Sequence, residues 1–153
     1  MLSKDIFKMV IEHAPLFAMD LVIINDEEKI LLGKRSNNPA KGFWFVPGGR
    51  VFKNESLDQA FRRISSNELG VALKRSNGTF LGLFEHFYDD SVFGSGISTH
   101  YINATHALRA NIDLANLPQS QHQEYVWMSV NEMQKNDDVH QYSKVFLSAL
   151  NGV

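Results

Sequence analysis

The segment from Ser56 to Gly70 constrains the fold most, because it carries both a start signal and a stop signal for one helix. Ser56 followed by Gln59 forms a capping box, in which each side chain bonds the backbone N–H of the other residue. Gly70 suits the left-handed position that follows a last helical turn. The sequence therefore predicts a helix over residues 57–69.

One face of this helix is apolar and carries a carboxylate. At about 100° per residue, the stripe that we expect to face the core consists of Leu57, Ala60, Phe61 and Ile64. Glu68 falls about 20° from Leu57 on the same wheel, hence within that stripe. Since an unpaired buried charge is costly, Glu68 is expected to have a specific partner, such as a metal ion or an arginine with backbone donors.

The other segments alternate between strand and helix patterns. We expect strands at 16–24, 29–35, 43–46, 79–88, 98–108 and 123–128, and helices at 3–12, from 129 onward and at 142–150. The first two strands form a hairpin around a polar turn, and Pro47-Gly48-Gly49 is expected to stop the third. This mixed order predicts an α+β sandwich.

Composition limits the class of protein. A chain of 153 residues with 44% hydrophobic residues supports one core, so we expect one domain over 1–153. A formal charge of -2 argues against nonspecific binding to nucleic acid. Without cysteine, any metal must bind oxygen or imidazole. No apolar run reaches the ~20 residues of a membrane span, so no membrane partner and a cytoplasmic location are expected.

The capped helix belongs to a longer pattern. Gly49, Glu55, Arg63, Glu68 and Gly70 follow the spacing of the Nudix box, and the chain therefore resembles the Nudix hydrolase family. The resemblance implies an α/β/α sandwich with a mixed β-sheet, on which the box helix packs.

The box departs from the common pattern at two positions. Ile64 and Asn67 stand where most Nudix boxes have glutamates. This abbreviated box is similar to that of the GDP-mannose mannosyl hydrolase branch of the family. Further similar segments are 33–35, 42–51, 86–90, 99–101, 121–122 and 136–140.

That resemblance implies a reaction and a cofactor. The expected reaction is Mg²⁺-dependent hydrolysis of GDP-mannose, with GDP-glucose as a second candidate, to GDP and the free sugar. Water would attack the anomeric carbon with inversion, and His122 would be the general base. Two missing carboxylates favour one Mg²⁺ ion per subunit. The family's ligand set implies Gly49, through its carbonyl, with Glu68 and Gln121.

Arginines, a tyrosine and Asp20 complete the expected catalytic group. Arg35 and Arg50 are candidate diphosphate ligands, and Tyr101 could hydrogen-bond a phosphate. Arg63 would either reach the leaving group or pair with Glu55 and hold the box loop.

Asp20 and two further residues are candidates for contacts with the substrate. Asp20, within an apolar strand, could bind a sugar hydroxyl or guanine, and His86 could lie beside the substrate. Phe7, in the apolar stripe with Leu2 and Ile6, could pack on its own domain. Alternatively, the stripe could cross to a second subunit and stack the base, as the homodimers of the family suggest.

Two other functions stay open at this point. An ordinary Nudix diphosphatase would cut a phosphorus–oxygen bond of a nucleoside diphosphate derivative. A nucleotide-sugar binder would have lost turnover, which the presence of Glu68, Gln121 and His122 argues against. His122 could also act only as a hydrogen-bond donor to the substrate.

Overall fold

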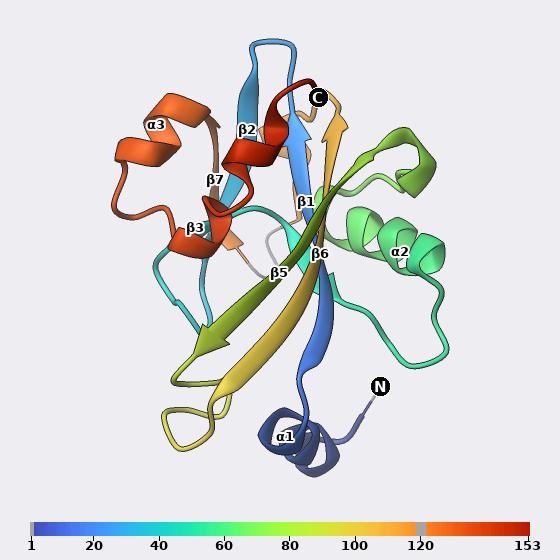
Figure 1. Ribbon diagram of the computed structural model, residues 1–153, viewed down its shortest axis with the longest axis vertical. Coiled ribbons are helices and arrows are strands. Elements are labelled where there is room, and N and C mark those ends of the chain that lie inside the picture. The colour runs from blue at the N-terminus through green and yellow to red at the C-terminus, as the bar shows by residue number, and fades with distance from the viewer. Residues whose placement is uncertain (1, 119–121) are drawn as a thin grey trace.

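The computed structural model describes residues 2–118 and 122–153, and of residues 122 and 123 it describes the backbone alone. Its strands form one sheet (Figure 1): β1 (Leu16–Ile24), β2 (Lys29–Arg35), β3 (Trp44–Phe45), β4 (Gly48–Arg50), β5 (Thr79–Tyr88), β6 (Thr99–Arg109) and β7 (His122–Ser129). The α-helices are α1 (Lys4–His13), α2 (Leu57–Leu69) and α3 (Val130–Lys135). Short 3-10 turns are η1 (Arg75–Asn77), η2 (Leu114–Asn116), η3 (Gln141–Ser143) and η4 (Leu147–Leu150).

The strand order is β3-β2-β1-β6-β5, with β4 paired to β1 and β7 paired to β2. β1 runs parallel to β6, from Leu16 opposite Tyr101 to Ile24 opposite Arg109. The other strand pairs are antiparallel. The sheet is therefore mixed, which confirms the predicted α+β class.

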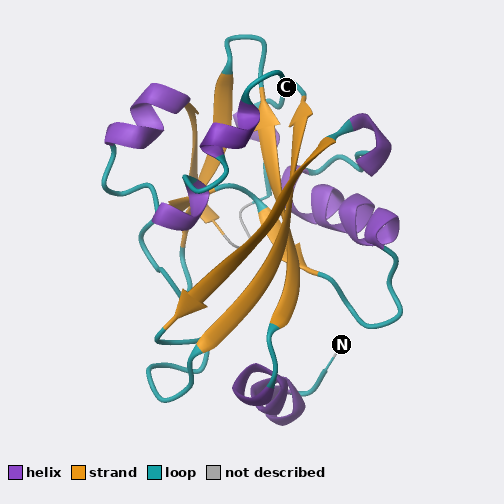
Figure 2. Cartoon of the chain, viewed as in Figure 1, coloured by secondary structure: helices purple, strands orange, loops and turns teal. Residues whose placement is uncertain are grey.

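The core has two parts, one on each face of the sheet. On one face, Met19 and Leu21 of β1 pack with Phe61 and Ile64 of α2. On the other face the buried cluster contains Val22, Ile30, Leu32, Met133, Phe146 and Leu147, from β1, β2, α3 and the C-terminal turns. Figure 2 shows α2 on one side of the strands and α3 with the C-terminal turns on the other. This is the expected layered α/β/α arrangement.

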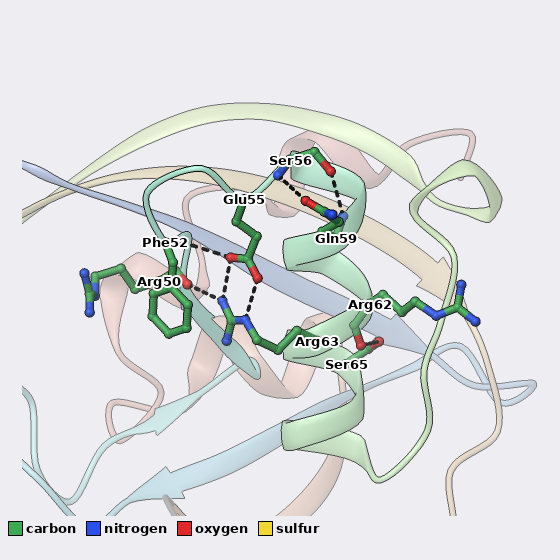
Figure 3. A network of polar contacts seen from close by, with 8 residues as sticks. All are labelled: Arg50, Phe52, Glu55, Ser56, Gln59, Arg62, Arg63 and Ser65. Atoms are coloured by element: carbon green, nitrogen blue, oxygen red, sulfur yellow. Dashed lines mark hydrogen bonds and ion pairs between the residues drawn. The ribbon is translucent and has the colours of Figure 1, made fainter. Parts of the chain in front are cut away.

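The predicted capping of α2 is confirmed. The hydroxyl of Ser56 accepts a hydrogen bond from the backbone N–H of Gln59 at 3.1 Å, and the Gln59 side chain accepts one from the Ser56 N–H at 2.8 Å (Figure 3). Gly70 closes the helix at φ 72°, in the left-handed region. The prediction was wrong for Leu57, which is 37% exposed. It is the first helical residue, so the core covers the stripe only from the second turn onward.

The third strand ends before Pro47, as expected, but a strand that was not expected follows it: in β4, Gly48 pairs with Asp20 of β1. A Cβ atom on Gly48 would lie 2.7 Å from the backbone carbonyl oxygen of Met19, so the pairing requires a glycine at this position. One other expectation was wrong. The helix expected at 142–150 is instead the separate turns η3 and η4, because its backbone bonds run from residue i+3 to i, as from the Leu147 N–H to the Lys144 carbonyl.

Candidate functional site

A pocket of about 320 Å³ lies where β1, β2, β4, β5, β6, α1 and α2 meet. Eight of the predicted site residues line it: Phe7, Asp20, Arg35, Gly49, Arg50, Glu68, His86 and Tyr101. β1 and β6 begin at the same end of the sheet, where α1 leads into β1 (Figure 1). Residues up to 94 positions apart in the sequence thus meet at one concave surface.

Three predicted residues have a different placement. Gln121 lies outside the described residues. For His122 the backbone alone is described, and it pairs with Arg35 across the β2–β7 ladder. The backbone of His122 therefore lies next to that of Arg35, which lines the pocket. Arg63 does not line the pocket.

Two buried carboxyl groups face the pocket from neighbouring elements. Glu68 of α2 is 5% exposed, and its Oε1 accepts a hydrogen bond from the Gly48 N–H at 3.3 Å. Asp20 of β1 is 9% exposed. Burial raises the pKa of Asp20 to about 7, although a hydrogen bond from the Asn103 side chain and the charge of Arg35 lower it. The carboxyl of Asp20 therefore changes its charge near neutral pH.

Asn103 of β6 orients this carboxyl, and no sequence signal identified it. Its Oδ1 accepts hydrogen bonds from the Asp20 N–H at 3.1 Å and from the Thr105 hydroxyl at 2.9 Å. These two bonds fix the orientation of the Asn103 side-chain amide. Its nitrogen is therefore the group that donates to the Asp20 carboxyl. An asparagine does not stand out in this strand, which also contains threonines and histidines.

The two candidate diphosphate arginines approach the pocket from β2 and β4. Arg35 donates from Nε to the Pro39 carbonyl at 2.9 Å, and its guanidinium lies 5.7 Å from the ring centre of Phe45. The guanidinium of Arg50 lies 4.5 Å from the ring centre of Phe7. Aromatic faces thus support both cations beside the pocket.

Neutral hydrogen-bonding groups form another wall of the pocket. Burial raises the pKa values of Tyr88 and Tyr101, so both phenols stay protonated at neutral pH. Burial lowers the pKa of His86 to about 4, with a smaller effect from His140, so its imidazole is neutral. The His86 ring stacks on Tyr142 with centroids 4.4 Å apart, and its buried Nε2 has no hydrogen-bond partner among the described residues. His86 thus brings a buried, unsatisfied polar atom to the lining of the pocket.

Tyr88 and His140 were not predicted as site residues. Tyr88 lines the pocket, whereas His140 lies behind it and stacks on Phe45 with centroids 4.6 Å apart. Aromatic residues near strand ends are too common for the sequence to single these two out.

Arg63 forms the predicted pair with Glu55 (Figure 3). Its Nε donates to Glu55 Oε2 at 2.7 Å, and one terminal nitrogen donates to Glu55 Oε1 at 3.0 Å and to the Arg50 carbonyl at 2.7 Å. The hydrogen bond from Arg63 holds the pKa of Glu55 below its ordinary value. Of the two expectations for Arg63, the structure shows the one in which it holds the box loop.

The two replaced box positions point away from metal binding. Ile64 is 1% exposed and packs in the core, where a Cβ atom on Gly49 would lie 3.1 Å from its Cγ1. Asn67 of α2 is exposed. Within the described part of the chain, no three His, Asp or Glu side chains gather as a metal-binding cluster. The box helix thus contributes one carboxylate, that of Glu68, to the pocket.

A family model described as the NUDIX domain matches residues 15–150. The chain belongs to the Nudix family. Nudix hydrolases generally use a divalent metal such as Mg²⁺ or Mn²⁺. None of the described helices is long and apolar enough to cross a membrane.

Two curated relatives share parts of the sequence. The low-salt glycan biosynthesis protein Agl8 of Haloferax volcanii is 46% identical over 101 residues, which cover 66% of this chain and 63% of Agl8. An ADP-ribose pyrophosphatase of Methanocaldococcus jannaschii is 39% identical over 72 residues, or 47% of this chain and 42% of that protein. The chain thus spans less than two thirds of the length of either relative.

Solved structures share the Nudix fold. The MutT protein of Methanosarcina mazei superposes with a TM-score of 0.72 at 22% identity, covering 91% of this chain and 95% of the other. A MutT Nudix hydrolase of Burkholderia pseudomallei gives 0.70 at 23% identity, covering 90% and 99%. At these identities the likeness confirms the predicted fold alone.

The N-terminal helix α1 packs on its own domain through Phe7. This side chain lines the pocket and lies 6.2 Å, between ring centres, from Phe93 of the loop after β5. Leu2 and Ile6 are 42% and 52% exposed. A contact of these two residues with a second subunit stays a prediction.

Proposed function

We propose that this Nudix enzyme hydrolyses GDP-mannose, with GDP-glucose as a second candidate, to GDP and the free sugar. Water attacks the anomeric carbon with inversion, and the reaction depends on one Mg²⁺ ion. The observation that carries the proposal is the single box carboxylate in the pocket, since Ile64 is buried in the core and Asn67 is exposed. The site lacks the carboxylate-rich helix that gathers several cations for attack on phosphorus.

The pocket residues fit one hard cation and a diphosphate. Glu68 offers a buried carboxylate, and β4 brings the backbone of Gly49 beside it. With Gln121, these residues would form the oxygen ligand set that Mg²⁺ prefers. When bound, the ion neutralises charge on the diphosphate as it leaves. Arg35, Arg50 and the Tyr101 phenol would bind the remaining diphosphate oxygens.

The reaction then needs a base more than an acid. Inverting glycoside hydrolysis usually pairs an acid at the leaving oxygen with a base at the water. GDP leaves as a stable anion, so the cation and the arginines can replace the acid. We assign the base to His122, which takes one proton from the attacking water.

Two residues are assigned to the sugar. Asp20 can accept from a hydroxyl when ionised and donate when protonated, because its pKa lies near 7. The unpaired Nε2 of His86 lies on the same wall. The name of Agl8, a glycan biosynthesis protein, supports a substrate that carries sugar. A homodimer remains our expectation for the assembly.

The rival function is cleavage of a phosphorus–oxygen bond, and similarity to an ADP-ribose pyrophosphatase favours it. A panel of GDP-mannose, GDP-glucose, UDP-glucose and ADP-ribose, each with Mg²⁺ and with EDTA, separates the two by products. We expect GDP and free sugar from the GDP-sugars only, and only with Mg²⁺. Nucleoside monophosphates as products would support the rival. Binding of GDP-mannose without any product would support a binder that has lost turnover.

A further inference from the structure

Phe52 lies on the loop between β4 and α2, against two guanidinium groups. Its ring centre is 3.9 Å from the guanidinium carbon of Arg63 and 5.0 Å from that of Arg50. Phe52 is 38% exposed, and it does not line the pocket.

The loop around Phe52 is fixed by a network centred on Glu55 (Figure 3). Glu55 Oε1 accepts a hydrogen bond from the Phe52 N–H at 3.0 Å, and the same carboxylate pairs with Arg63. Arg63 in turn donates to the Arg50 carbonyl. The Phe52 carbonyl also accepts from the Glu55 N–H at 3.2 Å, so the backbone on both sides of Phe52 is held.

The side chain of Arg50 is held in another way. Its guanidinium contacts two aromatic rings, that of Phe7 at 4.5 Å and that of Phe52 at 5.0 Å from the ring centres. It forms no hydrogen bond or ion pair with any residue that the structure describes. Cation–π contacts occupy the faces of a guanidinium and leave the N–H donors at its edge free. Those donors are the groups that bind phosphate oxygens.

The second cation does not compete for this role. The positive charge of Arg63 is compensated by Glu55, with which it makes two hydrogen bonds. Arg50 pairs with no carboxylate among the described residues, so its charge remains available to a ligand in the pocket. The Phe52 ring also keeps the two like charges on separate sides of an apolar group.

From this geometry we propose that Phe52 is a positioning residue, which holds the guanidinium of Arg50 at the pocket for an incoming diphosphate. The inference rests on the proposed function only in that the ligand is a nucleoside diphosphate. It is independent of which bond the enzyme breaks.

The test is calorimetric titration of the full chain with GDP and Mg²⁺. We expect Phe52→Leu to weaken GDP binding about ten-fold, within the range of a cation–π contact. Phe52→Tyr keeps the aromatic face and should bind GDP as the parent does. Phe80→Leu, at an exposed phenylalanine of β5 outside the pocket, is the matched control and should also bind normally.

A double-mutant cycle with Arg50→Gln separates positioning from a general effect on the fold. If Phe52 acts through Arg50, adding Phe52→Leu to Arg50→Gln causes no further loss of GDP affinity. During turnover, Phe52→Leu should raise KM more than it lowers kcat. Unchanged GDP affinity in Phe52→Leu, or the same loss in the Arg50→Gln background, would overturn the inference. A parent protein that bound no GDP would overturn the proposed function as well.

Discussion

Asp20 is a buried carboxyl group that lines the pocket. The pKa of its carboxyl in the folded protein is about 7, against 3.8 for an ordinary aspartate. Between these two pH values the folded state binds more protons than the unfolded state, so this residue makes the protein less stable as pH rises. This loss of stability is complete above pH 7, where the folded protein ionises Asp20, and absent below about pH 4.

Asp20→Asn should remove that cost. In EDTA, the free energy of unfolding of the variant relative to the parent should increase between pH 4 and pH 8, by about 4 kcal/mol at ~1.4 kcal/mol per pKa unit. Urea denaturation at the two pH values measures it. If the free energy of unfolding of the variant differed from that of the parent by the same amount at both pH values, the pKa of Asp20 would not be raised by burial.

His122 is the residue on which turnover depends most in this account. Removing a general base typically costs 10²–10⁴ in rate, so His122→Gln should lower kcat by about that factor. The matched control is His13→Gln on the surface of α1, where the histidine side chain is 68% exposed. Steady-state kinetics on GDP-mannose measure both variants, and a normal kcat in His122→Gln would remove this residue from the role of base.

At the scale of elements, α2 is the helix most tightly coupled to the core. Six of its residues are buried, against one in α1. Both helices begin with a serine cap, Ser56 in α2 and Ser3 in α1. Loss of the same type of cap should therefore affect global stability unequally.

Ser56→Ala should lower the free energy of unfolding by about 1 kcal/mol, the usual value of such a cap. Ser3→Ala should cost less than half as much, because α1 can fray without exposing the core. Chemical denaturation followed by circular dichroism compares the two variants. Equal losses would show that α1 is as strongly coupled to the core as α2.

The sequence predicted those elements whose signals are local. The ends of α2 follow from its caps, and β1 and β2 from continuous apolar runs. β4 was missed because Gly48 and Gly49 suggest a turn, whereas here glycine permits close approach to β1. The C-terminal helix was overpredicted because apolar spacing does not distinguish an α-helix from two 3-10 turns.

At the scale of the whole molecule, the site depends on pairings that no local pattern shows. Parallel pairing of β1 with β6 places Asp20 next to Thr105 in register, and Asn103 reaches Asp20 from the same strand. The candidate ligands Glu68 and Arg50 could be predicted from the box, but Asn103 and Tyr88 could not. Their contribution arises from strand register and burial, which are properties of the complete fold.

A contact from the C-terminal turns also helps to explain how β5 can lie at one end of the strand order. The hydroxyl of Tyr142 accepts from the Phe87 N–H and donates to the Phe87 carbonyl, each at 2.9 Å. These bonds use the polar backbone groups that an edge strand would otherwise expose at this residue. The same side chain stacks on His86, so the C-terminal turns support the wall of the pocket.

The central claim is that a Nudix fold with one box carboxylate in its pocket breaks a carbon–oxygen bond. Hydrolysis of GDP-mannose in ¹⁸O-labelled water, followed by mass spectrometry of both products, tests it most directly. We expect unlabelled GDP and a mannose that carries the label at its anomeric carbon. Label in a phosphate group, with GMP as the nucleotide product, would contradict it.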